Sequence, residues 1–251
     1  MLSVDRQQII FDQIRRKGSV RISQLMKSLA ASESTIRRDL EELERQGLIK
    51  RVHGGAVLVQ HMAIEASNYD KQDLFAEEKE RIGKFAASLV EEHSSILIDA
   101  GTTTAALARA LNTPNVKIIT NALNIAEILS SKKYTVLAAG GVIKTNTYAM
   151  VGEITIETIR NFHADICFLG MNGISEETGL TTPDMQEAWV KRAMMRAAEK
   201  VVLLADSSKF GKTTLTHVGE VGEVDILVTD EGLSVEDRNW LESNGVTVFC
   251  V

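Results

Sequence analysis

Small and polar residues recur immediately after runs of aliphatic residues in the larger, C-terminal part of the chain. The run Ile96–Ile98 is followed by Asp99-Ala100-Gly101-Thr102-Thr103-Thr104, a glycine turn with three hydroxyls that would open a helix. Backbone amides and hydroxyls at a helix N-terminus can hold a phosphate, and the helix dipole favours the anion. The same segment can equally form an ordinary strand-to-helix turn with a threonine cap, so both interpretations stay open at this point.

Four further aliphatic runs end on small, polar or charged residues. These ends are Thr120-Asn121, Gly140-Gly141, Gly170-Met171-Asn172-Gly173 and Asp206-Ser207-Ser208-Lys209. Lys209 is the cation best suited to a phosphate. Asp99, Asn121 and Asp206 can accept hydrogen bonds from sugar hydroxyls. Because ligands of open parallel sheets bind beyond the carboxyl ends of the strands, these residues predict a site for a phosphorylated sugar.

Glu187 and Lys191 lie one helical turn apart, shortly after Gly179-Leu180-Thr181-Thr182-Pro183-Asp184. A Glu–Lys pair at this spacing is typical of an exposed ion pair. At the start of a helix near the predicted mouth of the site, the pair can also close over a ligand. The predicted effector site comprises Asp99, Gly101, Thr102, Thr103, Thr104, Asn121, Gly140, Gly141, Asn172, Glu187, Lys191, Asp206 and Lys209.

The elements that must position these residues are predicted to alternate between strands and helices. The strands are expected at Ser95–Ala100, Val116–Thr120, Tyr134–Ala139, Asp165–Gly170, Val201–Ala205, Ile226–Thr229 and Val246–Val251. The helices are expected at Ala76–Glu92, Thr103–Leu111, Ala122–Ser130, Glu153–Arg160, Gln186–Lys200 and Ser234–Asn244. Continuous aliphatic strands that alternate with helices predict an α/β fold, in which a mostly parallel sheet is covered by helices on both faces.

The N-terminal part of the chain carries a different pattern. Ser32 is a suitable N-cap for a helix in which Ile36, Leu40 and Leu43 form one apolar face. The opposite side of this helix carries short polar residues and arginines. Short polar side chains near the start of such a helix can reach base edges in the DNA major groove, and arginine can pair with guanine or phosphate.

A single helix of this type is more often a solvated amphipathic helix than a DNA reader. Here predicted helices at Val4–Lys17 and Ser19–Leu29 precede it, the second separated from it by the short turn Ala30-Ala31-Ser32. Predicted strands at Leu48–Lys50 and Ala56–Val59 follow it. Three helices and a wing predict a winged helix-turn-helix that binds double-stranded operator DNA. The predicted DNA-binding residues are Ser32, Glu33, Ser34, Thr35, Arg37, Arg38, Arg45, Lys50, Arg51 and His53.

The charge distribution agrees with this division. The chain of 251 residues has a formal net charge of −6, but residues 1–60 alone carry a net charge of +4 and the remainder −10. A basic N-terminal part suits a polyanionic partner. We predict three regions: residues 1–58 as the DNA-binding domain, 59–75 as a linker, and 76–251 as the sensing domain.

Several classes of site are disfavoured by composition. Cys167 and Cys250 lie in apolar runs and are expected to be small buried core residues, without Cys or His neighbours that would complete a metal site. We therefore expect no metal and no cofactor. The polar N-terminus argues against a signal peptide, and no apolar run reaches membrane-spanning length, so we expect a cytoplasmic protein without membrane contact.

The chain resembles transcriptional regulators of the DeoR family along nearly its whole length. The resemblance is carried by Ser32-Glu33-Ser34-Thr35-Ile36-Arg37-Arg38-Asp39-Leu40 and by Arg51-Val52-His53-Gly54-Gly55-Ala56. It implies a sensor domain similar to the ribose-5-phosphate isomerase and coenzyme A transferase fold, which binds a phosphorylated sugar. It also implies repression of an operon for sugar uptake or catabolism, release by the sugar phosphate, and assembly as a homodimer or homotetramer.

The resemblance also implies roles for particular residues. Asp99, Gly101, Thr102 and Thr103 would form the phosphate loop. The residues placed in or around the effector cleft would be Thr120, Asn121, Gly140, Gly141, Gly152, Asp165, Gly170, Gly173, Glu187, Lys191, Asp206, Ser208 and Lys209. The runs FLGMNGIS and GLTTPD resemble repressors of fructose operons and suggest fructose 1-phosphate. Tagatose, galactitol, glucitol and inositol phosphates remain open, as does the operator sequence.

Two other functions are considered. A sugar-phosphate isomerase-like enzyme with an added DNA-binding domain would need a carboxylate base aimed at the substrate. The comparable segment, Gly170-Met171-Asn172-Gly173, contains none, so we expect a regulator rather than an enzyme. A DNA-binding structural protein without an effector is disfavoured by the polar strand ends.

Overall fold

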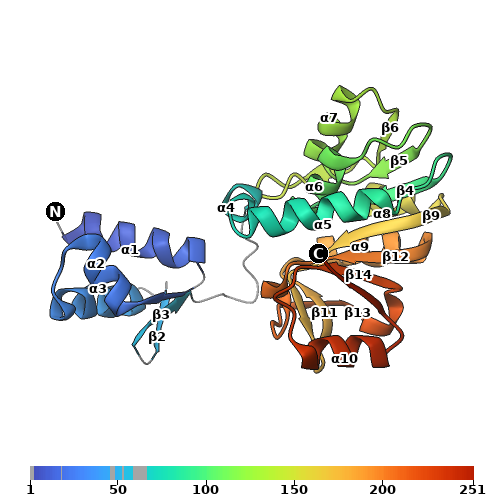
Figure 1. The fold of residues 1–251 in the computed structure, drawn as a ribbon. Helices are drawn as coiled ribbons and strands as arrows, with labels where there is room; N and C mark the ends of the chain where they lie inside the picture. The colour runs from blue at the N-terminus through green and yellow to red at the C-terminus, as the bar shows by residue number, and fades with distance from the viewer. Residues whose placement is uncertain (1–2, 18, 46–48, 53, 59–66) are drawn as a thin grey trace. The chain divides into compact units, whose positions relative to one another are not determined.

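The computed structural model describes residues 3–17, 19–45, 49–52, 54–58 and 67–251 (Figure 1). The chain divides into two compact units, Met1–His61 and Met62–Val251. Each unit has its own hydrophobic core and is described separately below.

The first unit contains three helices and a three-stranded antiparallel sheet. The helices are α1 (Ser3–Lys17), α2 (Ile22–Leu29) and α3 (Glu33–Arg45), and the strands β1 (Ser19–Arg21), β2 (Ile49–Val52) and β3 (Gly55–Leu58) are ordered β1-β3-β2. Ile10, Ile14, Leu25, Ile36 and Leu40 are fully buried between the helices. The predicted winged helix-turn-helix is therefore present, with one strand more than expected.

That additional strand occupies the first three residues of Ser19–Leu29, the stretch that was expected to carry the second helix. Ser19–Arg21 instead pairs with β3, where Val20 lies opposite Ala56. The β-branched Val20 is buried in this pairing, and the amide of Ile22 donates to the carbonyl of Gly54 at 2.9 Å. The helix can begin only after this contact is made, at Ile22.

Two polar contacts set the start and the orientation of α3. The Ser32 hydroxyl accepts the Thr35 amide at 3.3 Å, which confirms the predicted N-cap. Asp39, which is buried, accepts hydrogen bonds from Arg6 Nε at 2.5 Å and from Arg6 Nη2 at 3.1 Å. This bidentate pair joins α1 to α3 and holds the outer face of α3 in a fixed orientation.

The second unit is built on a seven-stranded parallel sheet ordered β15-β14-β12-β9-β4-β5-β6. Its strands are β4 (Ser95–Ile98), β5 (Lys117–Thr120), β6 (Val136–Ala138), β9 (Ala164–Gly170), β12 (Ala198–Leu204), β14 (Ile226–Thr229) and β15 (Thr247–Cys250). The predicted parallel sheet is confirmed. Its chain order reverses beside β4, because β5 and β6 extend the sheet on one side and β9 on the other. Ligands of such sheets bind at this reversal.

Helices cover both faces of the sheet (Figure 1). The helices α5 (Ala76–Ser88), α6 (Thr102–Ala110) and α7 (Leu123–Ser131) contribute to one core, and α8 (Glu153–Arg160), α9 (Met185–Arg196) and α10 (Val235–Ser243) to the other. Within β4, Ile96 and Ile98 belong to the first core and Leu97 to the second, as the alternation of side chains along a strand requires.

Shorter elements were not expected from the sequence. The strands β10 (Gly173–Ser175), β11 (Gly179–Thr182) and β13 (Thr216–Gly219) form a small antiparallel sheet, and β7 (Val142–Ile143) pairs with β8 (Met150–Val151). The short helical turns η1 (Ser207–Lys209) and η2 (Val221–Glu223) complete the unit. Strands of two to four residues are too short to show a periodic pattern in the sequence.

Two sequence expectations about the second unit are wrong. The helix predicted to reach Lys200 ends at Arg196, because Ala198 already pairs with Ala164 of β9. Cys167 is buried as expected, and burial raises the pKa of its thiol well above the ordinary value. Cys250, however, is exposed.

The end of the predicted linker packs onto the second unit. Residues 59–66 lie outside the described part of the chain, but Asn68–Gln72 forms a short helix, α4. Asn68 is buried; its amide donates to the Asn146 carbonyl at 2.8 Å and its side chain to the Thr147 carbonyl at 2.6 Å. Residues 67–75 therefore pack within the second unit.

Candidate functional site

A small cavity of about 50 Å³ lies at the carboxyl edge of the parallel sheet, where the chain order reverses. It is bounded by the segment after β4, the segment after β9, the first turns of α9 and η1, and the wall formed by α4 and α5. The lining residues are Asn68, Lys71, Lys79, Ala100, Gly101, Thr102, Thr103, Thr147, Gly170, Met171, Asn172, Glu187, Lys191, Leu204 and Lys209.

The start of α6 forms one wall of the cavity. Gly101, the N-cap residue, accepts the Ala105 amide at 3.0 Å, and Thr102 and Thr103 follow it along the lining. Amides in the first turn of a helix have no partner within the helix. They are therefore placed to hold an anion at this wall, as the sequence predicts.

Lysines dominate the adjoining walls: Lys71, Lys79, Lys191 and Lys209 all line the cavity. Lys79 is buried, and its Nζ donates to the carbonyls of Lys71 at 2.6 Å and Leu74 at 2.5 Å. Burial, followed by the nearby charge of Lys209, lowers the pKa of Lys79 to about 8. Lys191 pairs with Asp99 and Lys209 lies near Asp206, whereas the hydrogen bonds of Lys79 within the described residues go to uncharged carbonyls, so the positive charge at this wall favours an anionic ligand.

Asp206 lies beneath the lysine wall. Its side chain is fully buried, and its Oδ1 accepts the amide and the hydroxyl of Ser208, the amide at 3.2 Å. Its Oδ2 has no hydrogen bond among the described residues, and the Lys209 Nζ lies 3.6 Å away. Asp206 therefore positions Lys209 rather than facing the cavity itself.

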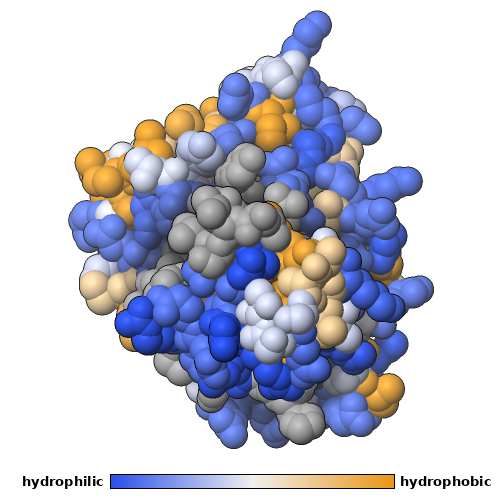
Figure 2. All heavy atoms as spheres, turned by 90° about the vertical axis from the view of Figure 1, so that its left-hand side faces the viewer, coloured by the Kyte–Doolittle hydropathy of each residue, from blue (hydrophilic) through white to orange (hydrophobic). Residues whose placement is uncertain are grey.

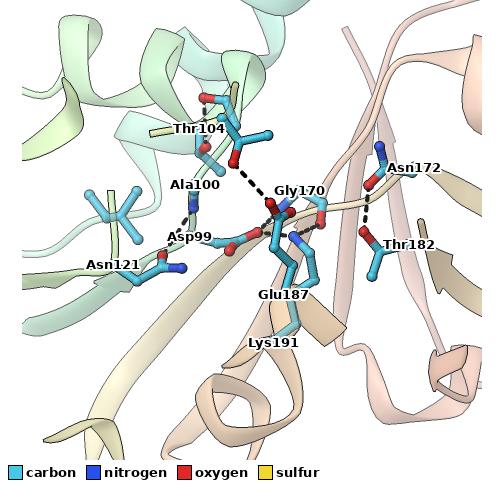
Figure 3. A network of polar contacts seen from close by, with 12 residues as sticks. Asp99, Ala100, Thr104, Asn121, Gly170, Asn172, Thr182, Glu187 and Lys191 are labelled. Atoms are coloured by element: carbon cyan, nitrogen blue, oxygen red, sulfur yellow. Dashed lines mark hydrogen bonds and ion pairs between the residues drawn. The ribbon is translucent and has the colours of Figure 1, made fainter. Parts of the chain in front are cut away.

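A buried ion pair supports the floor of the cavity (Figure 3). Asp99 and Lys191 are 2 % and 3 % exposed and are hydrogen-bonded to each other. Asp99 Oδ2 also accepts the Gly170 amide at 3.1 Å, and Lys191 Nζ donates to the Gly170 carbonyl at 2.9 Å. The pair thus ties the ends of β4 and β9 to α9.

Glu187 brings a carboxylate to the same cavity (Figure 3). It accepts the Thr147 hydroxyl at 2.8 Å, and Lys144 lies 3.6 Å away. Asn172, also in the lining, accepts the Thr182 hydroxyl at 2.9 Å. The lining thus combines carboxylate, amide and hydroxyl groups with lysines, which suits a ligand that carries both an anionic group and several hydroxyls.

The structure brings seven of the predicted effector residues together in the lining, namely Gly101, Thr102, Thr103, Asn172, Glu187, Lys191 and Lys209. Four others lie behind the lining and support it. Asp99 and Asp206 are described above, the Thr104 hydroxyl donates to the Gly101 carbonyl, and the Asn121 side chain accepts the Ala100 amide at 3.1 Å.

Gly140 and Gly141 do not belong to the cavity. They follow β6, which is the outermost strand of the sheet, and lead into β7. The Gly140 carbonyl accepts the Thr155 hydroxyl at 2.6 Å, and a Cβ on Gly141 would lie 2.6 Å from the Val151 carbonyl. Their backbone conformations, with φ of 74° and 109°, are ones that glycine adopts readily in a turn.

Several residues were expected near the cleft only because of the family resemblance. The structure places some of them in the cavity and others elsewhere in the second unit. Gly170 lines the cavity, but Asp165 accepts the amide and hydroxyl of Ser95 at the opposite, amino end of β4. Other members serve local structure: Thr120 donates to the Ile98 carbonyl, Gly152 is the N-cap of α8, and Gly173 begins β10.

Sequence reasoning missed Asn68, Lys71, Lys79 and Thr147. Lys79 lies in a helix whose charged residues are, in the sequence, typical of a solvent-exposed helix face. Asn68 and Lys71 fell in the presumed linker, and Thr147 in a loop without a motif. No local signal identifies them, because their role depends on the packing of α4 and α5 against the sheet.

The helix α3 carries the predicted DNA-binding residues Glu33, Ser34, Thr35, Arg37, Arg38 and Arg45, whereas Ser32 precedes the helix and Lys50 and Arg51 lie on β2. Arg38 is exposed, and no hydrogen bond or ion pair holds it within the described part of the chain. Arg37 pairs with Glu33, Arg45 with Glu42, and Arg51 with Glu41 and Glu44. The Ser32 hydroxyl contacts those of Ser34 and Thr35. His53 lies outside the described residues, and so does the side chain of Lys50.

The described residues also bear on metal binding and membrane insertion. Histidine, cysteine and acidic side chains do not gather there into a group that could hold a metal ion. None of the helices described is both long and apolar enough to span a membrane.

Comparison with known proteins gives matches in both units. Residues 6–62 match the model of the DeoR-like helix-turn-helix domain, and residues 74–231 match that of the DeoR C-terminal sensor domain. The chain is 37% identical to the transcriptional regulator FruR of Bacillus subtilis over 231 residues, 92% of each chain. It is 36% identical to the glycerol-3-phosphate regulon repressor of Escherichia coli over 232 residues, again 92% of each.

Among solved structures, ribose 5-phosphate isomerase A from Methanocaldococcus jannaschii is similar to the chain with a TM-score of 0.40 and 18% identity. The similarity covers 54% of this chain and 55% of the isomerase.

Proposed function

Since the chain belongs to the DeoR family of transcriptional regulators, we propose that it represses an operon for sugar uptake or catabolism and is released from its operator by a phosphorylated sugar. The relatives named as repressors and the match to a sensor domain support this proposal. The observation that carries the sugar-phosphate part is the cavity, in which four lysines and a helix N-terminus adjoin Glu187 and Asn172.

Each side of the cavity suits one end of such a ligand. A phosphate monoester carries close to two negative charges near neutral pH and has three acceptor oxygens, which match lysine ammonium groups and helix amides. Sugar hydroxyls both donate and accept, which matches Glu187, Asn172 and the threonine hydroxyls. Fructose 1-phosphate is the first ligand we propose, on the basis of the resemblance to fructose-operon repressors.

The cavity also suggests how the signal leaves the site. A ligand held in this cavity contacts its walls, so it can favour one position of a wall over another. Asn68 and Lys71 of α4 form one such wall, and α4 directly follows the residues that connect to the first unit. We propose that ligand entry displaces α4 and thereby changes the placement of the DNA-binding unit.

Operator binding titrated with sugar phosphates tests the proposed function. The protein is first bound to DNA from the region upstream of the operon that it regulates. Separate titrations then add fructose 1-phosphate, other ketose, hexitol and inositol phosphates, and the unphosphorylated sugars. One phosphorylated sugar should release the DNA while its unphosphorylated counterpart does not. Failure of the whole panel to bind would remove the effector proposal, and turnover of a ligand on the same samples would favour the isomerase-like alternative.

Replacing Arg38 by alanine should weaken operator binding. Arg38 is exposed and makes no contact that the fold needs among the described residues, so the variant should fold normally. We expect a loss of ~1–3 kcal/mol if Arg38 reads a base, and a smaller, sequence-independent loss with a shallower salt dependence if it contacts phosphate. Arg109→Ala, an exposed arginine of the second unit paired with Glu80, is the control. Unchanged affinity in both Arg37→Ala and Arg38→Ala would rule out α3 as the reading helix.

Effector affinity should fall as the pH rises through about 8. In the free protein Lys79 loses its proton near this pH, since its pKa is lowered by burial and by Lys209. A bound phosphate stabilises the protonated form, so binding above pH 8 must take up a proton. Between pH 7 and 9 we expect a loss on the order of tenfold, measured by calorimetry in buffers of different ionisation enthalpy. Lys79→Met should bind weakly and without proton uptake; equal uptake in that variant would contradict the assignment.

We also propose that the regulator acts as a homodimer or homotetramer. Helix-turn-helix dimers bind two half-sites about one helical turn apart or a multiple of that distance, so two DNA-binding units in one assembly match a palindromic operator.

A further inference from the structure

A groove of the second unit lies between α8 and α9, and the proposed function makes no use of it. Its volume is about 390 Å³, which is in the range of small-molecule sites. The groove is lined by facing residues of the two helices and by the segment that follows α8. Its lining shares no residue with that of the lysine-lined cavity, so the two are separate sites.

The helix α9 lies between the groove and the cavity. Trp189, Arg192 and Arg196 recur along it at intervals of three and four residues, which places them on one face of the helix, and all three line the groove. Glu187 and Lys191 lie on a different face of α9 and line the cavity. A substitution on the groove face can therefore be made without altering a residue of the cavity.

The groove is positively charged, although it belongs to an acidic part of the chain. Its lining contains three arginines, Arg160, Arg192 and Arg196, and one acidic residue, Glu153. Residues 61–251 as a whole carry a net charge of −10. A local excess of arginine in such surroundings attracts an anion to this place in particular.

The arginines of the groove retain charge and donors for a ligand. Arg192 donates from Nε and Nη2 to two carbonyls of β13, with Nε 3.0 Å from the Val218 oxygen, so its guanidinium group is oriented but not neutralised. Arg196 is exposed and makes no hydrogen bond or ion pair with another described residue. Arg160 pairs with Glu157 at 2.6 Å, but both side chains are more than half exposed, and pairs of this kind contribute little.

Arginines in the last turn of a helix also have a structural use, because they complement the helix dipole. Arg160 of α8 and Arg196 of α9 occupy such positions. Helix stability does not account for Arg192, which lies one turn before the end of α9, or for an aromatic residue beside it. The combination therefore indicates a ligand rather than helix stability alone.

Trp189 supplies a flat apolar surface next to these charges. The molecular surface is largely hydrophilic on the face shown in Figure 2, with hydrophobic groups gathered in a few patches. Trp189 is 43 % exposed and lines the groove. An accessible indole ring can stack on a heteroaromatic base, and a guanidinium group pairs with phosphate oxygens through two parallel hydrogen bonds.

We propose that this groove binds a nucleoside phosphate, with the base on Trp189 and the phosphate on Arg192 and Arg196. An inorganic anion would use the arginines but leave the indole without a role. The volume of the groove fits a single small ligand better than a length of peptide. The proposal goes beyond the proposed function and does not depend on it.

Calorimetric titration of the chain of 251 residues with nucleotides tests the proposal. The probes are ATP, GTP, UTP and AMP, with tripolyphosphate as a polyanion that lacks a base. At least one nucleotide should bind the parent more tightly than tripolyphosphate does. Arg196→Gln removes a charge and Trp189→Ala removes the stacking surface, and each should weaken binding of that nucleotide by ~10-fold or more.

Two further variants locate the binding. A nucleotide is also a phosphorylated sugar, so one that entered the cavity would lose affinity in Lys209→Met and keep it in Arg196→Gln. Arg238→Gln is the matched control for Arg196→Gln, because Arg238 is an exposed arginine of α10 outside the groove, and it should bind like the parent. Thermal unfolding verifies that each variant is folded, and Arg196→Gln decides if Trp189→Ala is not.

Three results would overturn the proposal. They are a parent that binds none of the nucleotides, a parent that binds tripolyphosphate as tightly as any nucleotide, and an affinity that Arg196→Gln and Trp189→Ala leave unchanged. Sugar-phosphate binding is measured on the same samples. Nucleotide binding that depends on Trp189 and Arg196, in a protein that no sugar phosphate binds, would contradict only the proposed function.

Discussion

Replacing Lys209 by methionine is expected to leave operator binding unchanged while weakening the response to sugar phosphate by on the order of 10- to 100-fold. Lys209 lines the cavity between the start of α6 and Lys79, and Asp206 holds it from below at 3.6 Å. A contact between an ammonium group and a phosphate removed from water is among the stronger polar interactions available to the site. Methionine keeps the aliphatic stem and removes only the charge.

In a cell this variant should behave as a super-repressor, which stays on its operator when the parent leaves. The measurement is operator binding titrated with the effector, for parent and Lys209→Met side by side. An isomerase-like enzyme would instead lose turnover in the variant, with no change in DNA release. Equal effector concentrations for release of both proteins would show that Lys209 does not hold the phosphate.

Lys212→Met provides a matched control. Lys212 is partly buried, and its pKa is lowered by burial and then by the charge of Lys209, so the two lysines share an environment. It does not belong to the cavity lining. The control should therefore respond to the effector nearly as the parent does, whereas an equal loss in both variants would indicate a general effect of positive charge.

The parts of this molecule that sequence predicts are those encoded by local patterns. Ile36, Leu40 and Leu43 recur at helical spacing after the Ser32 cap, and this local information is sufficient to define α3. The buried strands are continuous aliphatic runs, so their parallel arrangement follows from the helices between them. The polar ends of β4, β9 and β12 could be located for the same reason.

The remaining features of the fold and the site depend on the order of the strands and on packing between segments that are distant in the sequence. Gly140 and Gly141 have the same local character as Gly170, but β6 lies at the edge of the sheet while β9 lies next to β4. The residues within and beside a strand do not indicate which position the strand takes in the sheet. Lys79 is a similar case: it becomes a cavity residue only because its ammonium group binds the carbonyls of Lys71 and Leu74, which places α4 over the site.

Removing one partner of the buried Asp99–Lys191 pair should produce the largest loss of stability. Asp99→Asn keeps the shape of the side chain but removes the negative charge that is hydrogen-bonded to the Lys191 ammonium, which is 3 % exposed. Breaking a buried pair in this way costs ~3–5 kcal/mol. For a unit of this size the midpoint of thermal unfolding should fall by roughly 2–4 °C for each kcal/mol.

The chain of 251 residues divides into two compact units, so its unfolding need not be a single transition. Only the transition of the second unit should shift in Asp99→Asn, because Asp99, Gly170 and Lys191 all lie there. Lys191→Met should lower the free energy of unfolding by a similar amount, because it removes the ion-pair partner of the buried Asp99 carboxylate. The double variant should lose less than the sum of the two, because neither charge is then left unpaired.

An exposed ion pair shows what burial contributes. Arg109 and Glu80 approach to 2.6 Å but are 46 % and 56 % exposed, so Glu80→Gln should cost less than about 1 kcal/mol. A loss in Asp99→Asn no larger than in Glu80→Gln would mean that water reaches Asp99 and Lys191. Since this pair connects the ends of β4 and β9 beneath the cavity, its effect on stability also bears on the effector site. Weaker effector binding in Asp99→Asn at temperatures where it is fully folded would show that the pair fixes the geometry of the ligand-binding wall.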